Sequence, residues 1–253
     1  MLKAVTFDFW GTLMTEASQG TRRIRTERIC RIDEILRTDC ISITPEAIDR
    51  AYNAVGEQLT QLWMTLRDIG AQAQVDMLLD ILQVSAQSRS DLLMSRLVDA
   101  YTLPILTDLP IPLSGVVEVL SMLDARGYRM AVICNTGRTP GKILRIILER
   151  LGMGKYLSVQ TFSDEIGLRK PHPEIFKRTL AELDVEPPEA LHVGDTLASD
   201  VAGAHGAGMR AVHFCHPRGV DPNPGEGETI FSISELLKLI GNNHTGEGND
   251  IPI

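Results

Sequence analysis

Cysteines, aromatic residues and long apolar runs are scarce in this sequence of 253 residues. Its four cysteines form no CxxC pair and no Cys/His cluster with metal-site spacing: Cys30, Cys40, Cys134 and Cys215. This scatter argues against a disulfide framework and favours reduced thiols. No apolar run reaches the roughly 20 residues of a membrane-spanning helix, and the start of the sequence leaves no room for a signal peptide before the first predicted strand. We therefore expect a cytoplasmic protein that does not enter the membrane.

Basic residues are also fewer than acidic residues. The chain has 25 lysines and arginines against 33 acidic residues, a formal net charge of -8. This balance argues against non-specific binding to nucleic acid or to an anionic membrane surface. It leaves room for a small anionic substrate, because a bound metal or a few basic side chains can dominate one pocket. The expected partner is therefore a small molecule, and the sequence leaves open whether the protein is a monomer or a homodimer.

The start of the chain places one carboxylate at the end of an apolar run. The β-prone residues from Ala4 are followed by Asp8, and Gly11 then interrupts the pattern. Such a run predicts a buried strand that ends in a loop presenting the carboxylate. An ionised carboxylate there needs a cation or hydrogen-bond donors, or its pKa rises. Asp8 is therefore the first candidate functional residue.

In residues 16–108 the spacing of the apolar residues differs from that of the first strand. Apolar residues recur at helical spacing and strand-like runs are absent, which predicts a bundle of about four helices. Five arginines near the start of this segment are interpreted as a solvated helix face rather than an anion site: Arg22, Arg23, Arg25, Arg28 and Arg31.

The rest of the chain alternates between strands and helices. Strands are predicted over 129–134, 158–162, 190–193 and 211–214, with helices over 114–126, 140–151, 173–183 and 198–206. Alternation of this kind predicts an α/β fold, a doubly wound parallel sheet with helices on both faces. Its core would comprise residues 1–15 and 109–240, and residues 16–108 would form an inserted all-helical cap over the carboxyl ends of the strands. The polar tail 241–253 is expected to be disordered.

Polar residues follow four of the predicted strands or the loops after them. Their order along the chain is Asp8, Trp10, Thr12, Asn135, Thr136, Arg138, Lys170, Asp195 and Asp200. With their neighbours they resemble the four motifs of the haloacid dehalogenase-like (HAD) hydrolase superfamily, which are found in the same order. The matching stretches are Asp8 with Gly11-Thr12-Leu13, Asn135-Thr136-Gly137, Ser163-Asp164-Glu165 with Arg169-Lys170-Pro171, and Gly194-Asp195 with Asp200 and Gly203-Ala204.

The resemblance implies a Rossmann-like core, and a helical insert between the first two motifs is similar to the C1-capped branch. It implies a phosphohydrolase that uses Mg²⁺ and acts on a small phosphorylated metabolite. Asp8 would be the nucleophile that forms an aspartyl-phosphate. Asn135 and Lys170 would hold phosphoryl oxygens. Oxygen ligands suit Mg²⁺, and the implied set is Asp8, the backbone carbonyl of Trp10, Asp195 and Asp200.

Four further residues of these motifs are expected to contact the substrate. Thr12 and Thr136 lie within the first and second motifs, and Arg138 could reach an anionic group. Trp10 could line the pocket wall and select an apolar or aromatic leaving group.

Trp10 is also the main departure from the family pattern. HAD phosphatases resemble Asp-x-Asp-Gly-Thr, in which the second Asp protonates the leaving group and then activates water. General acid–base catalysis contributes about 10²–10⁴-fold, so a leaving group of low pKa or a side chain of the cap would have to compensate.

Two alternatives stay open. An aromatic residue at position 10 is similar to the Asp-x-Tyr-Gly-Thr motif of metal-independent 2-haloacid dehalogenases. Those enzymes lack a carboxylate at the position of Asp195, and three clustered carboxylates with Lys170 alone would be unfavourable without a cation, so the metal-dependent phosphatase is preferred. The second alternative is a catalytically weak or inactive binding protein with the HAD fold.

Overall fold

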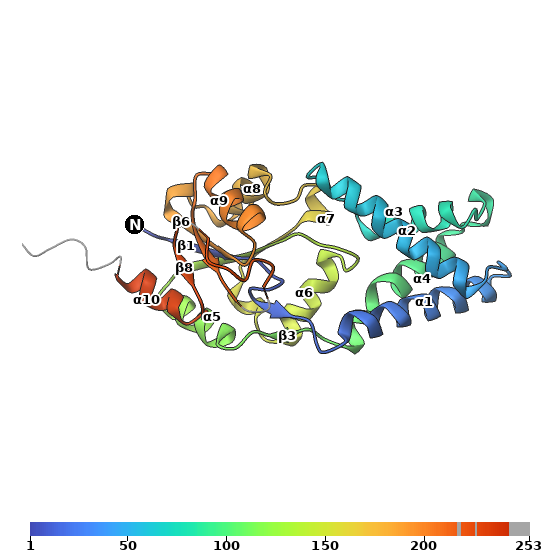
Figure 1. Ribbon diagram of the computed structural model, residues 1–253, viewed down its shortest axis with the longest axis horizontal. Helices are drawn as coiled ribbons and strands as arrows, with labels where there is room; N and C mark the ends of the chain where they lie inside the picture. Colours follow the sequence, from blue (N-terminus) through green and yellow to red (C-terminus); the bar gives the residue numbers. More distant parts are fainter. Residues whose placement is uncertain (217–218, 226, 243–253) are drawn as a thin grey trace, which may run out of the picture.

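A computed structural model describes residues 1–216, 219–225 and 227–242 (Figure 1). At its centre lies a six-stranded sheet in the order β5-β4-β1-β6-β7-β8, and every neighbouring pair is parallel. The strands are β1 (Ala4–Phe7), β4 (Arg129–Cys134), β5 (Val159–Phe162), β6 (Ala190–Gly194), β7 (Arg210–Phe214) and β8 (Thr229–Ile230). The predicted doubly wound α/β sheet is confirmed, and β8 is a strand that was not predicted.

Strand β1 lies where the winding of the sheet reverses. From β1 the chain continues to β4 and β5 on one side, and it then crosses back to β6, β7 and β8 on the other. In open parallel sheets, ligands bind at the carboxyl ends of the strands beside such a reversal. The residue that follows β1 is Asp8.

Alternating side chains of the strands pack into two apolar layers. Val5 and Phe7 point to the layer that contains α5 (Val116–Ala125), α6 (Gly141–Arg150) and α10 (Glu235–Asn242). Ala4 points to the opposite layer, which contains α8 (Pro173–Leu183) and α9 (Ala202–Gly206). Figure 1 shows these two helical layers on either side of the sheet. Burial on both faces explains why the strands read as continuous apolar runs.

Residues between β1 and β4 include four α-helices that extend away from the sheet (Figure 1). They are α1 (Gly20–Thr38), α2 (Pro45–Met64), α3 (Ala71–Ile81) and α4 (Asp91–Thr102), and we call them the helical insert. Their apolar side chains form a cluster separate from both layers of the sheet. At the start of α2, the Thr44 hydroxyl accepts a hydrogen bond from the Ala47 N–H and Pro45 occupies the first helical position. The boundaries at 15/16 and 108/109 stay a prediction.

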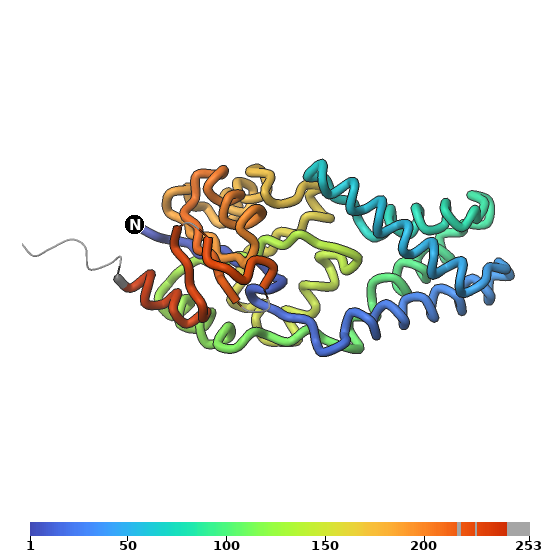
Figure 2. The backbone as a smooth tube through the Cα atoms, viewed as in Figure 1, coloured from blue at the N-terminus to red at the C-terminus, as the bar shows by residue number. Residues whose placement is uncertain are grey.

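The chain enters and leaves the helical insert at neighbouring points (Figure 2). There β2 (Met14–Thr15) pairs in antiparallel fashion with β3 (Ile111–Pro112). A second contact lies at the far side of the insert, where the Asp68 N–H donates to the Gly167 carbonyl and the Arg169 N–H donates to the Leu66 carbonyl. The helical insert is thus attached to the core beside Lys170.

Several expected elements differ in detail. The predicted helix over 198–206 begins as a π-helix, Leu197–Val201, before α9, and a short helix α7 (Ser163–Ile166) follows β5. Helix α10 includes residues 241 and 242, so these two are helical rather than disordered; the remainder of the expected tail, 243–253, lies outside the described residues. Short 3₁₀ helices occur at Ala86–Ser88, Leu103–Thr107, Gly154–Tyr156 and Pro187–Glu189. No helix in the described ranges is long and apolar enough to cross a membrane.

Candidate active site

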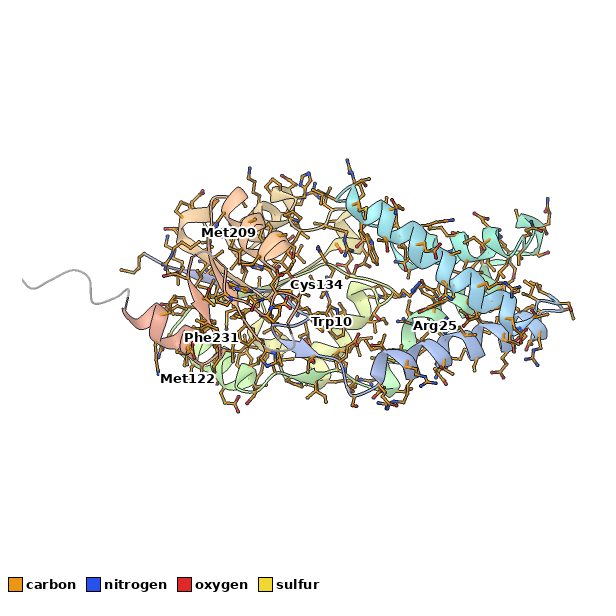
Figure 3. The ribbon with its side chains drawn as sticks, in the orientation of Figure 1. Trp10, Arg25, Met122, Cys134, Met209 and Phe231 are labelled. Carbon is orange, nitrogen blue, oxygen red and sulfur yellow. The ribbon has the colours of Figure 1, made fainter. Side chains whose placement is uncertain are left out.

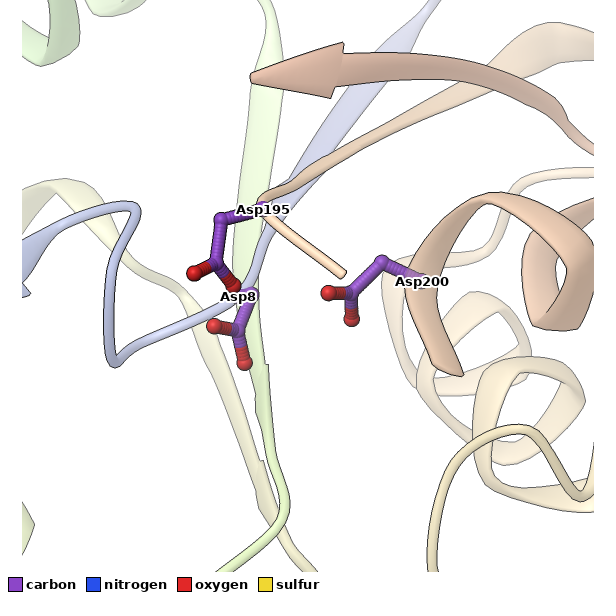
Figure 4. A group of neighbouring side chains, drawn as sticks. All are labelled: Asp8, Asp195 and Asp200. Carbon is purple, nitrogen blue, oxygen red and sulfur yellow. The ribbon is translucent and has the colours of Figure 1, made fainter. Parts of the chain in front are cut away.

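Three aspartates converge at the carboxyl edge of the sheet (Figure 4). Asp8 follows β1, Asp195 follows β6, and Asp200 lies in the π-helix after β6. One oxygen of each carboxylate lies within 4.8 Å of the other two, and all three residues are buried. The parallel sheet therefore brings together side chains that are about 190 positions apart in the sequence.

Lys170 lies between two of these carboxylates. Its Nζ is 2.6 Å from Asp8 Oδ1 and 2.6 Å from Asp200 Oδ1. The ammonium group is buried, with 1% of the side chain exposed. The predicted meeting of Lys170 with the strand-end carboxylates is thus present in the structure, and it places a compact positive charge directly beside Asp8.

The three carboxylates have different proton affinities because their surroundings differ. Burial raises the pKa of Asp8 to about 7; Lys170 opposes this rise, while Asp200 and Asp195 add to it. Burial also raises the pKa of Asp195, against the hydrogen bond from the Val220 N–H. Lys170 and His192 outweigh the effect of burial at Asp200 and hold its pKa well below the usual range.

Two glycines make room for the carboxylates. A Cβ at Gly11 would lie 2.1 Å from Asp195 Oδ2, and the φ of +75° at Gly11 is also unfavourable for other residues. A Cβ at Gly194 would lie 2.3 Å from Asp200 Cγ. Larger residues at either position would therefore displace a carboxylate from the cluster.

The cluster has the donor set of a divalent-cation site. When all three aspartates are ionised, Lys170 neutralises only one of the three negative charges, so the site gains from a further cation. Carboxylate oxygens are the ligands that Mg²⁺ prefers. Asp8, Asp195 and Asp200 are the residues predicted for this role, together with the Trp10 carbonyl.

Asn135 is hydrogen-bonded to the backbone of Lys170. Its Nδ2 donates to the Lys170 carbonyl (2.9 Å), and its Oδ1 accepts from the Lys170 N–H (2.7 Å). The amide therefore holds the backbone of Lys170 by two hydrogen bonds, which leaves one amide hydrogen for a ligand.

The two threonines expected to contact the substrate are buried in the protein interior. The Thr136 hydroxyl donates to Asp68 Oδ2 (3.2 Å) and lies 3.1 Å from the Ser163 hydroxyl. Thr12 is fully buried, and its hydroxyl has no hydrogen-bond partner in the described part of the chain. The structure thus places both side chains in the interior, and the substrate contacts expected for them stay a prediction.

Trp10 and Arg138 do lie on a cavity. The cavity has a volume of about 530 Å³ and is bounded by α1 and α2 of the helical insert on one side and by core loops on the other. Figure 3 shows Trp10 at the edge of the core that faces the insert, with Arg25 on the opposite α1. Trp10 also packs edge-to-face on Phe9, with ring centroids 4.8 Å apart.

Asp68 lies between α2 and α3 and was not among the residues predicted from the sequence. Its buried carboxylate accepts hydrogen bonds from Ser163 (2.5 Å), Thr136 (3.2 Å) and Arg169 (2.6 Å) of the core and from Trp63 (2.9 Å) of the insert. No local signal could have found this residue, because its core partners are 68 to 101 positions away.

The solvated face predicted for the arginines of α1 needs one correction. Arg28 is buried and donates hydrogen bonds to the Tyr52 hydroxyl (3.2 Å) and the Thr139 hydroxyl (2.9 Å). Helical periodicity turns this side chain toward the core loops. The positive charge of the five arginines therefore did not by itself indicate which of them are solvated. The other four arginines are exposed or half-buried, as expected.

Comparisons with known proteins agree with this architecture. In sequence, the chain is 36% identical to the glyceraldehyde 3-phosphate phosphatase of Pyrococcus abyssi (strain GE5 / Orsay) over 132 residues, 51% of this chain and 54% of that protein. The chain spans about half the length of the curated relatives it matches.

Solved structures match over nearly the whole chain. A HAD phosphatase from Thermococcus onnurineus is 26% identical, with a TM-score of 0.61 and coverage of 95% of this chain and 98% of that one. A 2-haloacid dehalogenase from Pseudomonas syringae pv. Tomato DC3000 shares the fold, with 21% identity, a TM-score of 0.65 and coverage of 96% and 99%. The family model of haloacid dehalogenase-like hydrolases matches residues 2–208. The chain therefore belongs to the haloacid dehalogenase-like hydrolase family.

Proposed function

We propose that this protein is a Mg²⁺-dependent phosphohydrolase that acts on a small phosphate ester through Asp8. The observation that carries the proposal is the position of Lys170 Nζ, 2.6 Å from both Asp8 and Asp200, within a cluster that contains a third carboxylate, Asp195. A metal-independent dehalogenase has no evident use for this excess of negative charge, whereas a phosphatase can use it to hold a cation. The Pyrococcus relative is named a glyceraldehyde 3-phosphate phosphatase, and this supports a small phosphorylated substrate for the present protein.

In this proposal Asp8 attacks the phosphorus atom. One Oδ forms a bond to phosphorus while the bond to the ester oxygen breaks, and the resulting aspartyl-phosphate is later hydrolysed by water. Lys170 lies beside the attacking carboxylate and stabilises negative charge on the phosphoryl group. Asn135 fixes the backbone of Lys170 and has one amide hydrogen left for a phosphoryl oxygen.

Asp8, Asp195, Asp200 and the Trp10 carbonyl would hold the Mg²⁺. When bound, the ion offsets the repulsion between the carboxylates and the phosphate dianion and polarises a phosphoryl oxygen. Burial raises the pKa of Asp8 and of Asp195, and the neighbouring carboxylates add to the rise. A bound cation would favour the ionised form of both side chains.

Trp10 occupies the position of the usual general acid in this family. Its indole cannot protonate a leaving oxygen at neutral pH, so the chemistry favours esters whose leaving group has a low pKa. Because the ring lines the cavity beside the helical insert, we propose that it contacts the leaving group. The insert would act as the cap that closes over this group.

The deciding experiment measures two reactions of the purified protein. Turnover of 4-nitrophenyl phosphate is expected with Mg²⁺ and not with a chelator, and Asp8→Asn should lower kcat by at least about 10³-fold because the covalent route is closed. Asp184→Asn is the matched control, since the Asp184 side chain is 94% exposed.

Release of chloride from 2-chloropropionate that is insensitive to a chelator would overturn the proposal in favour of a dehalogenase. Mg²⁺ binding without turnover of either compound would instead indicate a binding protein. We also propose that the protein acts in the cytoplasm; whether it does so as a monomer or a homodimer can be measured by light scattering.

A further inference from the structure

The cavity between the core and the helical insert contains a buried positive charge that has no acidic partner among the residues the structure describes. Its walls include Trp10 and Gly137, which follow Asp8 and Asn135 by two residues each. The loops that carry the proposed catalytic residues therefore also form part of this cavity.

Arg28 contributes the first charge. The residue is 7% exposed, and its two guanidinium hydrogen bonds go to the neutral hydroxyls of Tyr52 and Thr139. Within the described ranges, its Nε–H has no hydrogen-bond partner and no carboxylate forms an ion pair with its guanidinium. A buried charge that lacks a counter-ion is costly, so the arrangement gains stability when an anion enters the cavity.

Arg138 contributes the second charge from the facing loop. Its guanidinium lies over the Tyr52 ring, 3.8 Å from the ring centroid, and donates to the Tyr52 carbonyl (2.8 Å) and the Tyr101 hydroxyl (3.3 Å). These partners are again uncharged. Gly56 provides the space for this side chain, because a Cβ there would lie 2.6 Å from an Arg138 guanidinium nitrogen.

The acidic side chains around the cavity do not neutralise these two arginines. Asp108 pairs with Arg23 at 2.7 Å. Glu16 accepts a hydrogen bond from Thr21, and Glu57 is exposed to solvent. Arg25 also lines the cavity, but its charge is offset by Asp49 at 2.8 Å.

We propose that this cavity binds a second anionic group of the substrate, a carboxylate or a second phosphate, at the end remote from the phosphoryl group that Asp8 attacks. This inference rests on the proposed phosphohydrolase function. Arg28 from α1 and Arg138 from the loop after β4 both bind the remote group. Trp10, two residues after Asp8, lines the same cavity. The substrate class is therefore a small phosphate ester that carries a further negative charge.

Three substrates with one carbon skeleton test the proposal. Glycerol 3-phosphate is neutral at its remote end, 3-phosphoglycerate carries a carboxylate there, and glycerol 1,3-bisphosphate carries a phosphate. We expect kcat/KM for one or both of the doubly anionic compounds to exceed that for glycerol 3-phosphate by about 10- to 100-fold, the range for a charge-assisted hydrogen bond. Whichever compound is preferred identifies the remote group.

The variants Arg28→Gln and Arg138→Gln should each lower this preference by about 10-fold or more, because each removes one charge that the remote group contacts. Arg22→Gln is the matched control: Arg22 lies on the same helix, is exposed and does not line the cavity. If Arg28→Gln fails to fold, Arg138→Gln and the preference of the wild type still provide the test. Equal kcat/KM values for all three compounds, or a preference that survives both substitutions, would overturn the inference.

Binding to Asp8→Asn separates this inference from the proposed function. Calorimetry should show tighter binding of a doubly anionic compound than of glycerol 3-phosphate, and Arg28→Gln should remove the difference. Selective binding by Asp8→Asn, together with a wild type that has no phosphatase activity, would refute the proposed reaction and retain the anion site. Turnover of all three compounds with equal kcat/KM would support the proposed reaction and refute the anion site.

Discussion

Asn135 and Lys170 are joined by two reciprocal hydrogen bonds. The Asn135 amide donates to the Lys170 carbonyl at 2.9 Å and accepts from the Lys170 N–H at 2.7 Å. The residue after β4 thereby fixes the loop that places Lys170 Nζ 2.6 Å from Asp8. Asn135 is thus a positioning residue for the lysine, whatever further contact it makes with a phosphoryl oxygen.

Substitution of Asn135 should therefore act through Lys170. We expect Asn135→Ala to lower kcat for 4-nitrophenyl phosphate by about 10²-fold, the usual effect of disturbing one group that stabilises developing charge. In a Lys170→Met background the same substitution should have little further effect, because residues that act as a unit are not additive. Steady-state kinetics of the two single variants and the double variant measure this coupling. Fully additive losses would mean that Asn135 acts on the substrate independently of Lys170.

Mg²⁺ binding should depend on pH. Burial raises the pKa of Asp8 to about 7 and also raises that of Asp195, so the metal-free site binds protons below neutral pH. Mg²⁺ needs ionised carboxylates and must displace these protons. We therefore expect the affinity for Mg²⁺ to increase as the pH rises from 5.5 to 8. Calorimetry at pH 6 in buffers of different ionisation enthalpy should detect release of about one proton per ion. An affinity that stays constant over this range would show that Asp8 is ionised throughout.

Asp68 should be essential for the stability of the contact between the insert and the core. Asp68→Ala leaves the Arg169 guanidinium, which is 12% exposed, without its carboxylate and removes acceptors from Ser163 and Thr136. Breaking a buried ion pair in this way typically costs about 3–5 kcal/mol. Urea unfolding followed by circular dichroism measures the change in the free energy of unfolding.

Asp39→Ala provides the control for Asp68. Asp39 also belongs to the insert segment and pairs with an arginine, Arg96, but both side chains are about one-third exposed. Loss of such a pair should cost about 1 kcal/mol or less. Equal destabilisation by the two substitutions would contradict the special role of Asp68.

Trp10→Asp should restore the missing general acid. A carboxyl group at this position would face the cavity that Trp10 lines, and general acid catalysis contributes most when the leaving group is a poor one. We expect the ratio of kcat for glycerol 3-phosphate to kcat for 4-nitrophenyl phosphate to increase by about 10²-fold. Trp10→Asn is the control, because it has the same size as the aspartate and no proton to donate. The same ratio in both variants would indicate that another side chain already protonates the leaving group.

The alternation of apolar runs and amphipathic segments determined the parallel sheet and its helices by itself. A strand buried on both faces must be apolar along its whole length, and Asp8, Asn135 and Asp195 stand out because each follows such a strand. The motif spacing was also enough to select Lys170 and Asp200. These features are local, or they follow from the rule that the strand ends of a parallel sheet meet at one edge.

Tertiary structure alone decided how the side chains share their hydrogen bonds. The hydroxyl of Thr136 is bonded to Asp68, and the amide of Asn135 is bonded to the backbone of Lys170; the motifs indicated neither bond. The burial of Arg28 could not be read from a run of arginines, because it depends on where α1 docks against the loop at Thr139. Partners 35 to 111 positions apart are brought together only by the packing of the insert and the loops on the core, and that packing leaves no periodic signal in the sequence.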